Sequence, residues 1–157
     1  MATFGATTAK EFLDKLHEEQ ADFIASHCLS TRHALNAIIT AYHLHEWVWG
    51  ECRANRPELI KKWGLAPKRG ADEFLAYLIG QCPGIEDARR VANGTKHFGL
   101  KKIETGTHDG AFSSDFSDAF DVSYLWIERD GTRERAKSFV DELADFWDAF
   151  FLQNGLG

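Results

Sequence analysis

The stretch that decides the fold runs from Ser30 to Arg53 and reads S-T-R-H-A-L-N-A-I-I-T-A-Y-H-L-H-E-W-V-W-G-E-C-R. Its apolar residues recur three and four positions apart, which predicts one long helix that Ser30 caps. The broad apolar face comprises Leu35, Ile38, Ile39, Tyr42 and Trp49, and alanine, valine and leucine residues extend it. A helix that is apolar over most of its surface is buried. The stretch therefore predicts a helical bundle built around this segment.

One narrow stripe of the same helix is polar. It comprises His33, Asn36, Thr40 and His43, with Trp47 one turn beyond. A buried polar group without a hydrogen-bond partner costs about 1–3 kcal/mol, so a polar stripe on a buried helix needs a polar surface or water against it. We therefore expect a second polar surface to face this stripe.

The natural candidate for that surface is the segment from Ile85 to Phe98, I-E-D-A-R-R-V-A-N-G-T-K-H-F. Taken as a helix, it places Ile85, Ala88, Val91, Ala92 and Phe98 on one side and Glu86, Arg90, Asn93 and His97 on the other. An alternative polar grouping, slightly around the helix, is Arg89, Asn93 and Lys96. Positions three, four and seven apart share a helix face. Gly94 within the pattern indicates close packing, a kink or an early end of the helix.

The two polar surfaces together predict a site that binds a ligand or a protein partner between the helices at 30–53 and 85–98. The binding residues that we expect there are His33, Asn36, Thr40, His43, Trp47, Asn93 and Lys96. His45 falls on the apolar side of its helix, and we expect a core histidine with one satisfied nitrogen.

Capping residues and prolines mark the ends of further helices in the rest of the chain. Thr8 and Glu11 form a capping box at the start of a helix that reaches about His27. A short helix is expected from Pro57 to Trp63, another from Asp72 through Ile79, and a last one over about Ala136 to Leu152.

The segment between the helix at 85–98 and the last helix has a different character. Strands are expected at Leu100–Thr107, Val122–Ile127 and Thr132–Arg135, with a Ser/Asp-rich loop at Phe112–Phe120 and a tight hairpin turn at Asp130-Gly131. The sequence thus predicts a mainly α fold, a bundle of about four main helices with a C-terminal β-hairpin before the last helix. We expect one domain over 1–157, with the hairpin inserted at about 100–135.

Composition narrows the possible partners and the compartment. The chain has 157 residues, 44% hydrophobic residues and a net charge of -6, which argues against a general nucleic-acid coat or binding to an anionic membrane. No apolar run approaches the roughly 20 residues that a membrane span needs, and Met1–Lys10 does not resemble a signal peptide. Cys28, Cys52 and Cys82 are far apart and form no C-x-x-C pair. We therefore expect a cytoplasmic protein without a membrane partner.

Arg90 and His97 are separated by six residues, and in this R-x6-H spacing the chain resembles the HEPN family, whose motif is R-x4–6-H. HEPN proteins are small helical nucleotide-binding and ribonuclease domains. The resemblance implies a metal-independent endoribonuclease that acts on RNA as a homodimer. It also implies that Arg90 holds a phosphate and that His97 is a general base or acid, for which an imidazole pKa near neutrality is suitable. The chain departs from the family pattern at Val91, where a polar residue is usual.

Two other interpretations of the polar residues stay open. His33, His43 and His97, with Glu46 or Glu86, are ligand types that could converge on a metal, but no H-E-x-x-H or E-x-x-H spacing occurs and we expect no metal or other cofactor. Alternatively, Asn36, Thr40, His43, Asn93 and His97 form a hydrogen-bonded network that only fixes helix register. A bacterial or phage assembly protein with an unknown partner would fit this interpretation.

Overall fold

The computed structural model describes residues 5–97, 103–108 and 123–157. The described helices are α1 (Ala9–Ala25), α2 (Thr31–Asn55), α3 (Pro57–Lys62), α4 (Ala71–Gln81), α5 (Gly84–His97) and α6 (Ala136–Asn154). The described strands are β1 (Ile103–His108), β2 (Tyr124–Arg129) and β3 (Thr132–Arg135). The expected loop at 112–120 and the first residues of the expected strand at 100–107 lie outside the described residues.

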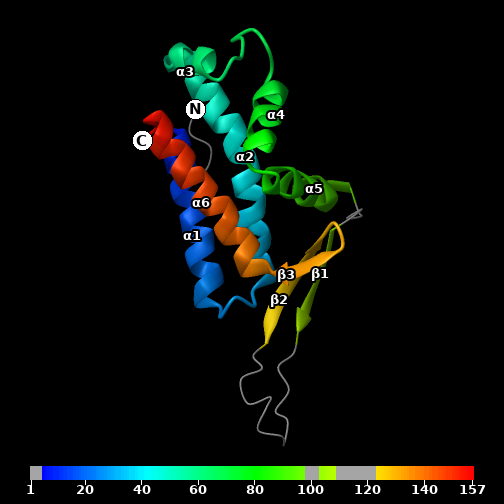
Figure 1. Cartoon of the computed structure of the whole chain (residues 1–157). Coiled ribbons are helices and arrows are strands. Elements are labelled where there is room, and N and C mark those ends of the chain that lie inside the picture. Colours follow the sequence, from blue (N-terminus) through cyan, green and yellow to red (C-terminus); the bar gives the residue numbers. More distant parts are fainter. Residues whose placement is uncertain (1–4, 98–102, 109–122) are drawn as a thin grey trace, which may run out of the picture.

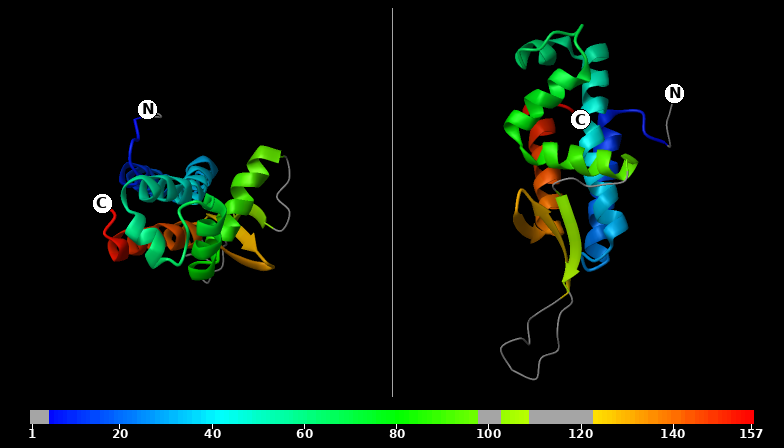
Figure 2. Two further views of the ribbon diagram at one scale, coloured as in Figure 1. Left: turned by 90° about the horizontal axis from the view of Figure 1, so that it is seen from above. Right: turned by 90° about the vertical axis from the view of Figure 1, so that its right-hand side faces the viewer.

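The long helices α1, α2 and α6 run alongside one another and form the body of the molecule (Figure 1). Their shared core contains Trp147 of α6, which is fully buried and donates its indole N–H to the backbone oxygen of Ala41 in α2 at 2.8 Å. The helix α5 lies across this bundle beside α2, and the sheet lies below α5 and against α6 (Figure 2). The shorter helices α3 and α4 lie at the end of the bundle opposite the sheet.

Local sequence signals explain where the helices begin. Thr8 and Glu11 form the predicted capping box, with the Glu11 N–H donating to the Thr8 hydroxyl at 3.1 Å and the Thr8 N–H donating to the Glu11 carboxylate at 3.0 Å. The side chain of Ser30 accepts from the backbone N–H of His33 at 3.3 Å, which confirms it as the N-cap of α2. Because Pro83 has no N–H to continue a helix, α4 and α5 are separate helices.

The three strands form one antiparallel sheet in the order β1-β2-β3. Asp130 and Gly131 join β2 to β3 with φ values of 49° and 80°, and positive φ at both positions is typical of a type I′ turn. Gly106 of β1 pairs with Trp126 of β2, and a Cβ at Gly106 would overlap the indole ring. The glycine therefore lets the indole lie flat across β1.

The prediction of a mainly α fold is confirmed, but its details need correction. The described part of the chain has six helices rather than about four main ones, and α3, α4 and α5 lie where the sequence predicts helices at 57–63, 72–79 and 85–98. The hairpin is part of a three-stranded sheet, since β1 pairs with β2 along its whole length from Ile103 to His108. Among the described helices, none combines the length and the apolar character that crossing a membrane requires.

Candidate functional site

The first half of the polar stripe on α2 faces α1. Nδ1 of His33 lies 3.2 Å from a carboxylate oxygen of Glu19, and the amide nitrogen of Asn36 donates to the same carboxylate at 3.3 Å. Lys15 donates to the hydroxyl of Thr40 at 2.8 Å. The prediction that His33, Asn36 and Thr40 face the helix at 85–98 is therefore wrong. These residues, with Lys15 and Glu19, form what we call the α1–α2 seam.

The α1–α2 seam satisfies its polar groups inside the fold. Burial raises the pKa of the Glu19 carboxyl, but hydrogen bonds from His33 and Asn36 and the charge of Lys15 outweigh it and hold the pKa below its ordinary value. Glu19 is thus ionised at neutral pH, and it fixes the register of the two helices through charge-assisted hydrogen bonds. This half of the polar stripe has the contacts of a structural network rather than of an open site.

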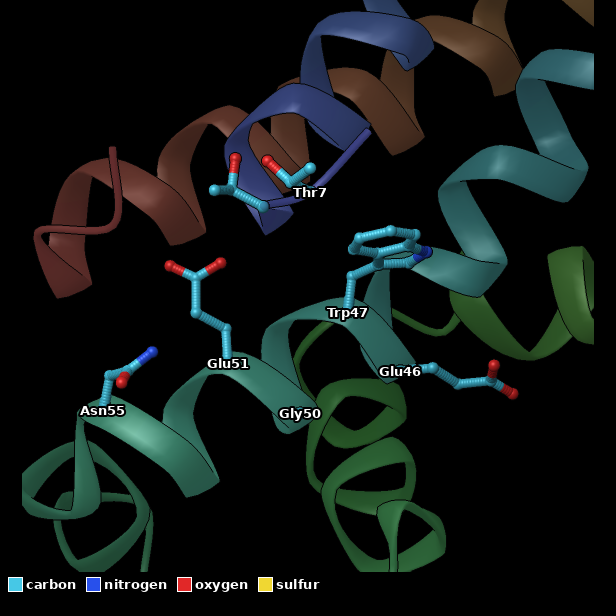
Figure 3. A pocket seen from close by; sticks show the side chains of 7 residues that line it. Thr7, Glu46, Trp47, Gly50, Glu51 and Asn55 are labelled. Carbon is cyan, nitrogen blue, oxygen red and sulfur yellow. The ribbon is translucent and has the colours of Figure 1, made fainter. Parts of the chain in front are cut away.

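Trp47, the last residue of the predicted stripe, also turns toward α1. Its indole stacks on Phe12 with the ring centroids 4.9 Å apart and the planes 15° from parallel. The rest of the ring lines a groove of about 460 Å³ between the start of α1 and the second half of α2, which we call the Trp47 groove (Figure 3). Its lining also includes Thr8, Glu46, Gly50, Glu51 and Asn55.

The Trp47 groove is acidic. Glu51 accepts the backbone N–H of Ala9 at 2.7 Å, so its carboxylate lies over the first turn of α1. The side chain of Glu46 is 57% exposed and lies 3.8 Å from Nδ1 of His43. Among the described residues that line the groove, none is basic.

Next to the stripe, Tyr42 and its neighbours occupy the side of α2 that faces α4 and α5. The ring of Tyr42 lies 4.9 Å from that of His43 and 4.8 Å from that of His45. His45 is 2% exposed, and its Nδ1–H donates to the backbone oxygen of Tyr42 at 2.5 Å, which confirms the expected core histidine. Burial lowers the pKa of His45, so its imidazole is neutral at pH 7.

The helix α5 continues through Gly94 to His97, so the glycine does not end it. Glu86 binds the guanidinium of Arg89 with two hydrogen bonds, of 2.7 Å from Nε and 2.6 Å from Nη2. Hydrogen bonds from Arg89 lower the pKa of Glu86, so this pair is fully charged. The charges of Arg89 and Glu86 reach Tyr42, whose phenol has a raised pKa, chiefly through burial. Tyr42, His43, Glu86 and Arg89 make up what we call the Tyr42–Arg89 face, and Asn93 follows Arg89 by one turn on the same side of α5.

Arg90 is turned toward the sheet rather than toward α2. Its guanidinium lies 3.3 Å from Glu86, 3.3 Å from Asp87 and 3.6 Å from Asp130 in the hairpin turn. Three carboxylates thus offset its charge. The side chains of Lys96 and His97 lie outside the described residues, so their predicted roles stay predictions.

A second charged cluster lies where α5, the sheet and α6 meet, and sequence reasoning missed it. Arg129 of β2 contacts Asp87 at 3.1 Å, Glu134 at 2.5 Å and Glu142 at 2.9 Å, and its guanidinium lies 4.2 Å from the ring centroid of Phe139. A hollow of about 350 Å³ borders the cluster. The five residues come from four separate elements, and no spacing in the sequence connects them.

The described residues contain no group of three or more His, Cys, Asp or Glu side chains that could hold a metal ion. Comparisons of the chain with protein-family models, with curated proteins and with solved structures find no match.

Proposed function

We propose that the protein is a binding domain, and that its ligand presents an anionic or carbonyl oxygen to Arg89 at the Tyr42–Arg89 face. The observation that carries the proposal is that the guanidinium of Arg89 is partly exposed although Glu86 pairs with it. The Arg89 side chain is 39% exposed, and Glu86 binds it from one side with two hydrogen bonds. The face lies between α2 and α5, which is the location that the sequence predicts for the site.

The geometry of Arg89 is suited to oxygen recognition. A guanidinium has five N–H groups, and the two hydrogen bonds to Glu86 leave the remaining ones for a ligand. Its planar fork matches a phosphate or a carboxylate, and because Glu86 already fixes the plane, less side-chain entropy is lost on binding. Tyr42 adds a protonated phenol, because its raised pKa keeps the proton in place at neutral pH.

Adenosine monophosphate is a suitable probe, since it combines an anion with an aromatic base that can contact Tyr42 and His43. We expect it to shift the backbone amide signals of Tyr42, Arg89 and Asn93 in a titration followed by ¹⁵N–¹H NMR. Arg89→Ala should weaken binding by at least about tenfold, because hydrogen bonds to charged groups contribute about 1.5–3 kcal/mol. Arg89→Lys should bind with intermediate strength, because it keeps the charge without the fork.

The matched control is Arg69→Ala. Arg69 is also an exposed arginine in a carboxylate pair, 2.6 Å from Glu73, but it lies before α4 and away from the face. The variant should bind the probe as the unaltered protein does. If Arg89→Ala binds equally well, or if the shifted signals lie elsewhere, the proposed site is wrong.

A second candidate is the HEPN-like endoribonuclease, and the observation that favours it is the continuity of α5. Because the helix runs unbroken from Gly84 to His97, positions 90 and 97 are seven residues apart on one helix and share a face. An R-x6-H motif needs this arrangement to act on one phosphate. Against it, the three carboxylates around Arg90 compete with a phosphate for its guanidinium.

A ribonuclease of this kind should cleave single-stranded RNA in the presence of EDTA and should be a dimer in solution. Arg90→Ala and His97→Ala should each slow cleavage at least about a hundredfold, in the range of general acid–base catalysis. Arg69→Ala should leave the rate unchanged. Gel analysis of labelled RNA and light scattering measure the two properties. Absence of cleavage, or a monomer that cleaves without these side chains, would exclude the motif as the active site.

A further inference from the structure

The Trp47 groove differs in charge from the Tyr42–Arg89 face, because the charged residues of its described lining are acidic. We propose that it binds a linear aliphatic di- or polyamine, with one ammonium group near Glu46, another near Glu51 and the methylene chain across Trp47. The groove lies between α1 and α2, and its Glu46 is next to His43 and Tyr42 at the edge of the Tyr42–Arg89 face, but the inference does not depend on the proposed function.

The charge of the groove selects a cation. Glu46 and Glu51 are the charged residues of the described lining, and no basic side chain there offsets them. The groove also borders the N-terminus of α1, where free backbone N–H groups would normally favour an anion. Here Glu51 accepts from the N–H of Ala9 and Thr8 accepts from the N–H of Glu11. With these donors already satisfied, the two carboxylates dominate.

The placement of the carboxylates selects a long cation over a metal ion. Glu51 follows Glu46 by five positions, which corresponds to about 140° around the helix and about 7.5 Å along it. The two side chains point to opposite sides of Trp47 and Gly50 (Figure 3). They cannot converge on one small ion, but two ammonium groups joined by a carbon chain can reach both.

Trp47 and Gly50 provide the surface between the two carboxylates. Because Phe12 covers one face of the indole, the remaining part of the ring lines the groove. Indole rings attract cations and also pack against methylene groups. Gly50 lies within α2, and a Cβ added there would meet no atom within 4 Å. The space above Gly50 is therefore open, and a groove of about 460 Å³ is within the range of small-molecule sites.

Isothermal titration with diamines tests the proposal. Spermidine should bind more tightly than butylamine, which has one ammonium group, and cadaverine should bind more tightly than propane-1,3-diamine. The double variant Glu46→Gln/Glu51→Gln should weaken spermidine binding by at least about tenfold, since two charge-assisted contacts are lost. The amide introduced by Glu51→Gln keeps an oxygen for the N–H of Ala9, so α1 stays capped. Glu18→Gln, an exposed glutamate of α1, is the control and should have no such effect.

The variant Gly50→Met shows whether binding is lost because the groove is blocked or because the fold is damaged. Its side chain should fill the groove and abolish spermidine binding, while the better helix propensity raises the melting temperature by about 2 °C. Gly80→Met in α4 is matched, because a Cβ there also meets no atom within 4 Å. It should raise the melting temperature similarly and leave binding unchanged. Arg89→Ala should not weaken spermidine binding, because both carboxylates of the groove remain, and this result distinguishes the groove from the site of the proposed function.

Two sources of the ammonium groups are distinguishable. A capped Gly-Lys-Lys-Gly peptide that binds more tightly than spermidine, and that loses binding in Gly50→Met, identifies lysine side chains of a protein as the natural ligand. Tighter binding of spermidine identifies a free polyamine. The proposal is overturned if Gly50→Met binds spermidine as the unaltered protein does, or if butylamine binds as tightly as spermidine.

Discussion

Arg129→Met should lower the free energy of unfolding by about 3 kcal/mol at pH 7, because removing one partner of a buried ion pair leaves uncompensated charge. Arg129 is 17% exposed, and it contacts Asp87, Glu134 and Glu142 with distances between 2.5 and 3.1 Å. Methionine keeps the packing against Phe139 but offers no charge to these carboxylates. Urea unfolding followed by circular dichroism measures the change.

This loss should depend on pH in a defined direction. Burial already raises the pKa of Asp87 above its ordinary value of 3.8, although Arg129 and Arg90 oppose the shift. Without Arg129 the pKa of Asp87 should rise further. A carboxyl whose pKa is higher in the folded state binds its proton more tightly there, so stability is lost as the pH rises through that pKa. The difference between Arg129→Met and the unaltered protein should therefore shrink as the pH falls from 7 to 5.

Arg133→Met is the matched control for Arg129→Met. Arg133 lies in the same hairpin and pairs with Glu128 at 3.4 Å, but its side chain is 55% exposed. Exposed ion pairs contribute about 0–1 kcal/mol, so this variant should lose less than about 1 kcal/mol. An equal loss in the two variants, or a loss in Arg129→Met that is the same at pH 5 and pH 7, would contradict the buried-charge explanation.

Trp147→Ala should lower the free energy of unfolding by about 4 kcal/mol, within the range for large aromatic residues in a core. Trp147 is fully buried, and its indole N–H bonds to the backbone oxygen of Ala41 at 2.8 Å. The variant removes a large apolar volume between α6 and α2 as well as a hydrogen bond between them. Urea unfolding, monitored through the helical signal in far-ultraviolet circular dichroism, gives the comparison with the unaltered protein.

Two variants define the contribution of Trp147. Trp147→Phe keeps most of the apolar area but loses the bond to Ala41, so we expect a loss of about 1–2 kcal/mol. Trp126→Ala removes an indole that lies partly exposed on the sheet, and its loss should be less than half that of Trp147→Ala. If Trp126→Ala is as damaging as Trp147→Ala, the main core does not lie between α2 and α6.

Local signals in the sequence were sufficient to predict the elements. Thr8 with Glu11, Ser30, Pro57 and the pair Asp130-Gly131 each mark an end or a turn that the structure contains. These signals work because each one satisfies or removes backbone hydrogen bonds within a few residues of its own position. The prediction of helices and strands therefore needed no knowledge of their neighbours.

The partners of the polar groups were not predictable in this way. Periodicity shows which residues share a helix face, but it does not show which helix packs against that face. His33 and Asn36 contact Glu19. In the sequence, the position of Glu19 is equally consistent with a solvent-exposed site on an amphipathic helix. The Arg129 cluster is even harder to predict from the sequence, because its members are brought together only by the packing of the sheet on α5 and α6.

The ion pairs of α5 also connect the Tyr42–Arg89 face to the far side of the molecule. Charges of alternating sign follow one another from Arg89 to Glu86, Arg90, Asp87 and Arg129 at distances between 2.6 and 3.3 Å. If an anion binds the remaining N–H groups of Arg89 as proposed, its charge would weaken the attraction between Arg89 and Glu86, and Glu86 would then hold Arg90 more strongly against the pull of Asp87. Because such coupling is reciprocal, a change in the hairpin that carries Arg129 would alter the affinity of the proposed binding face, which the hairpin does not contact.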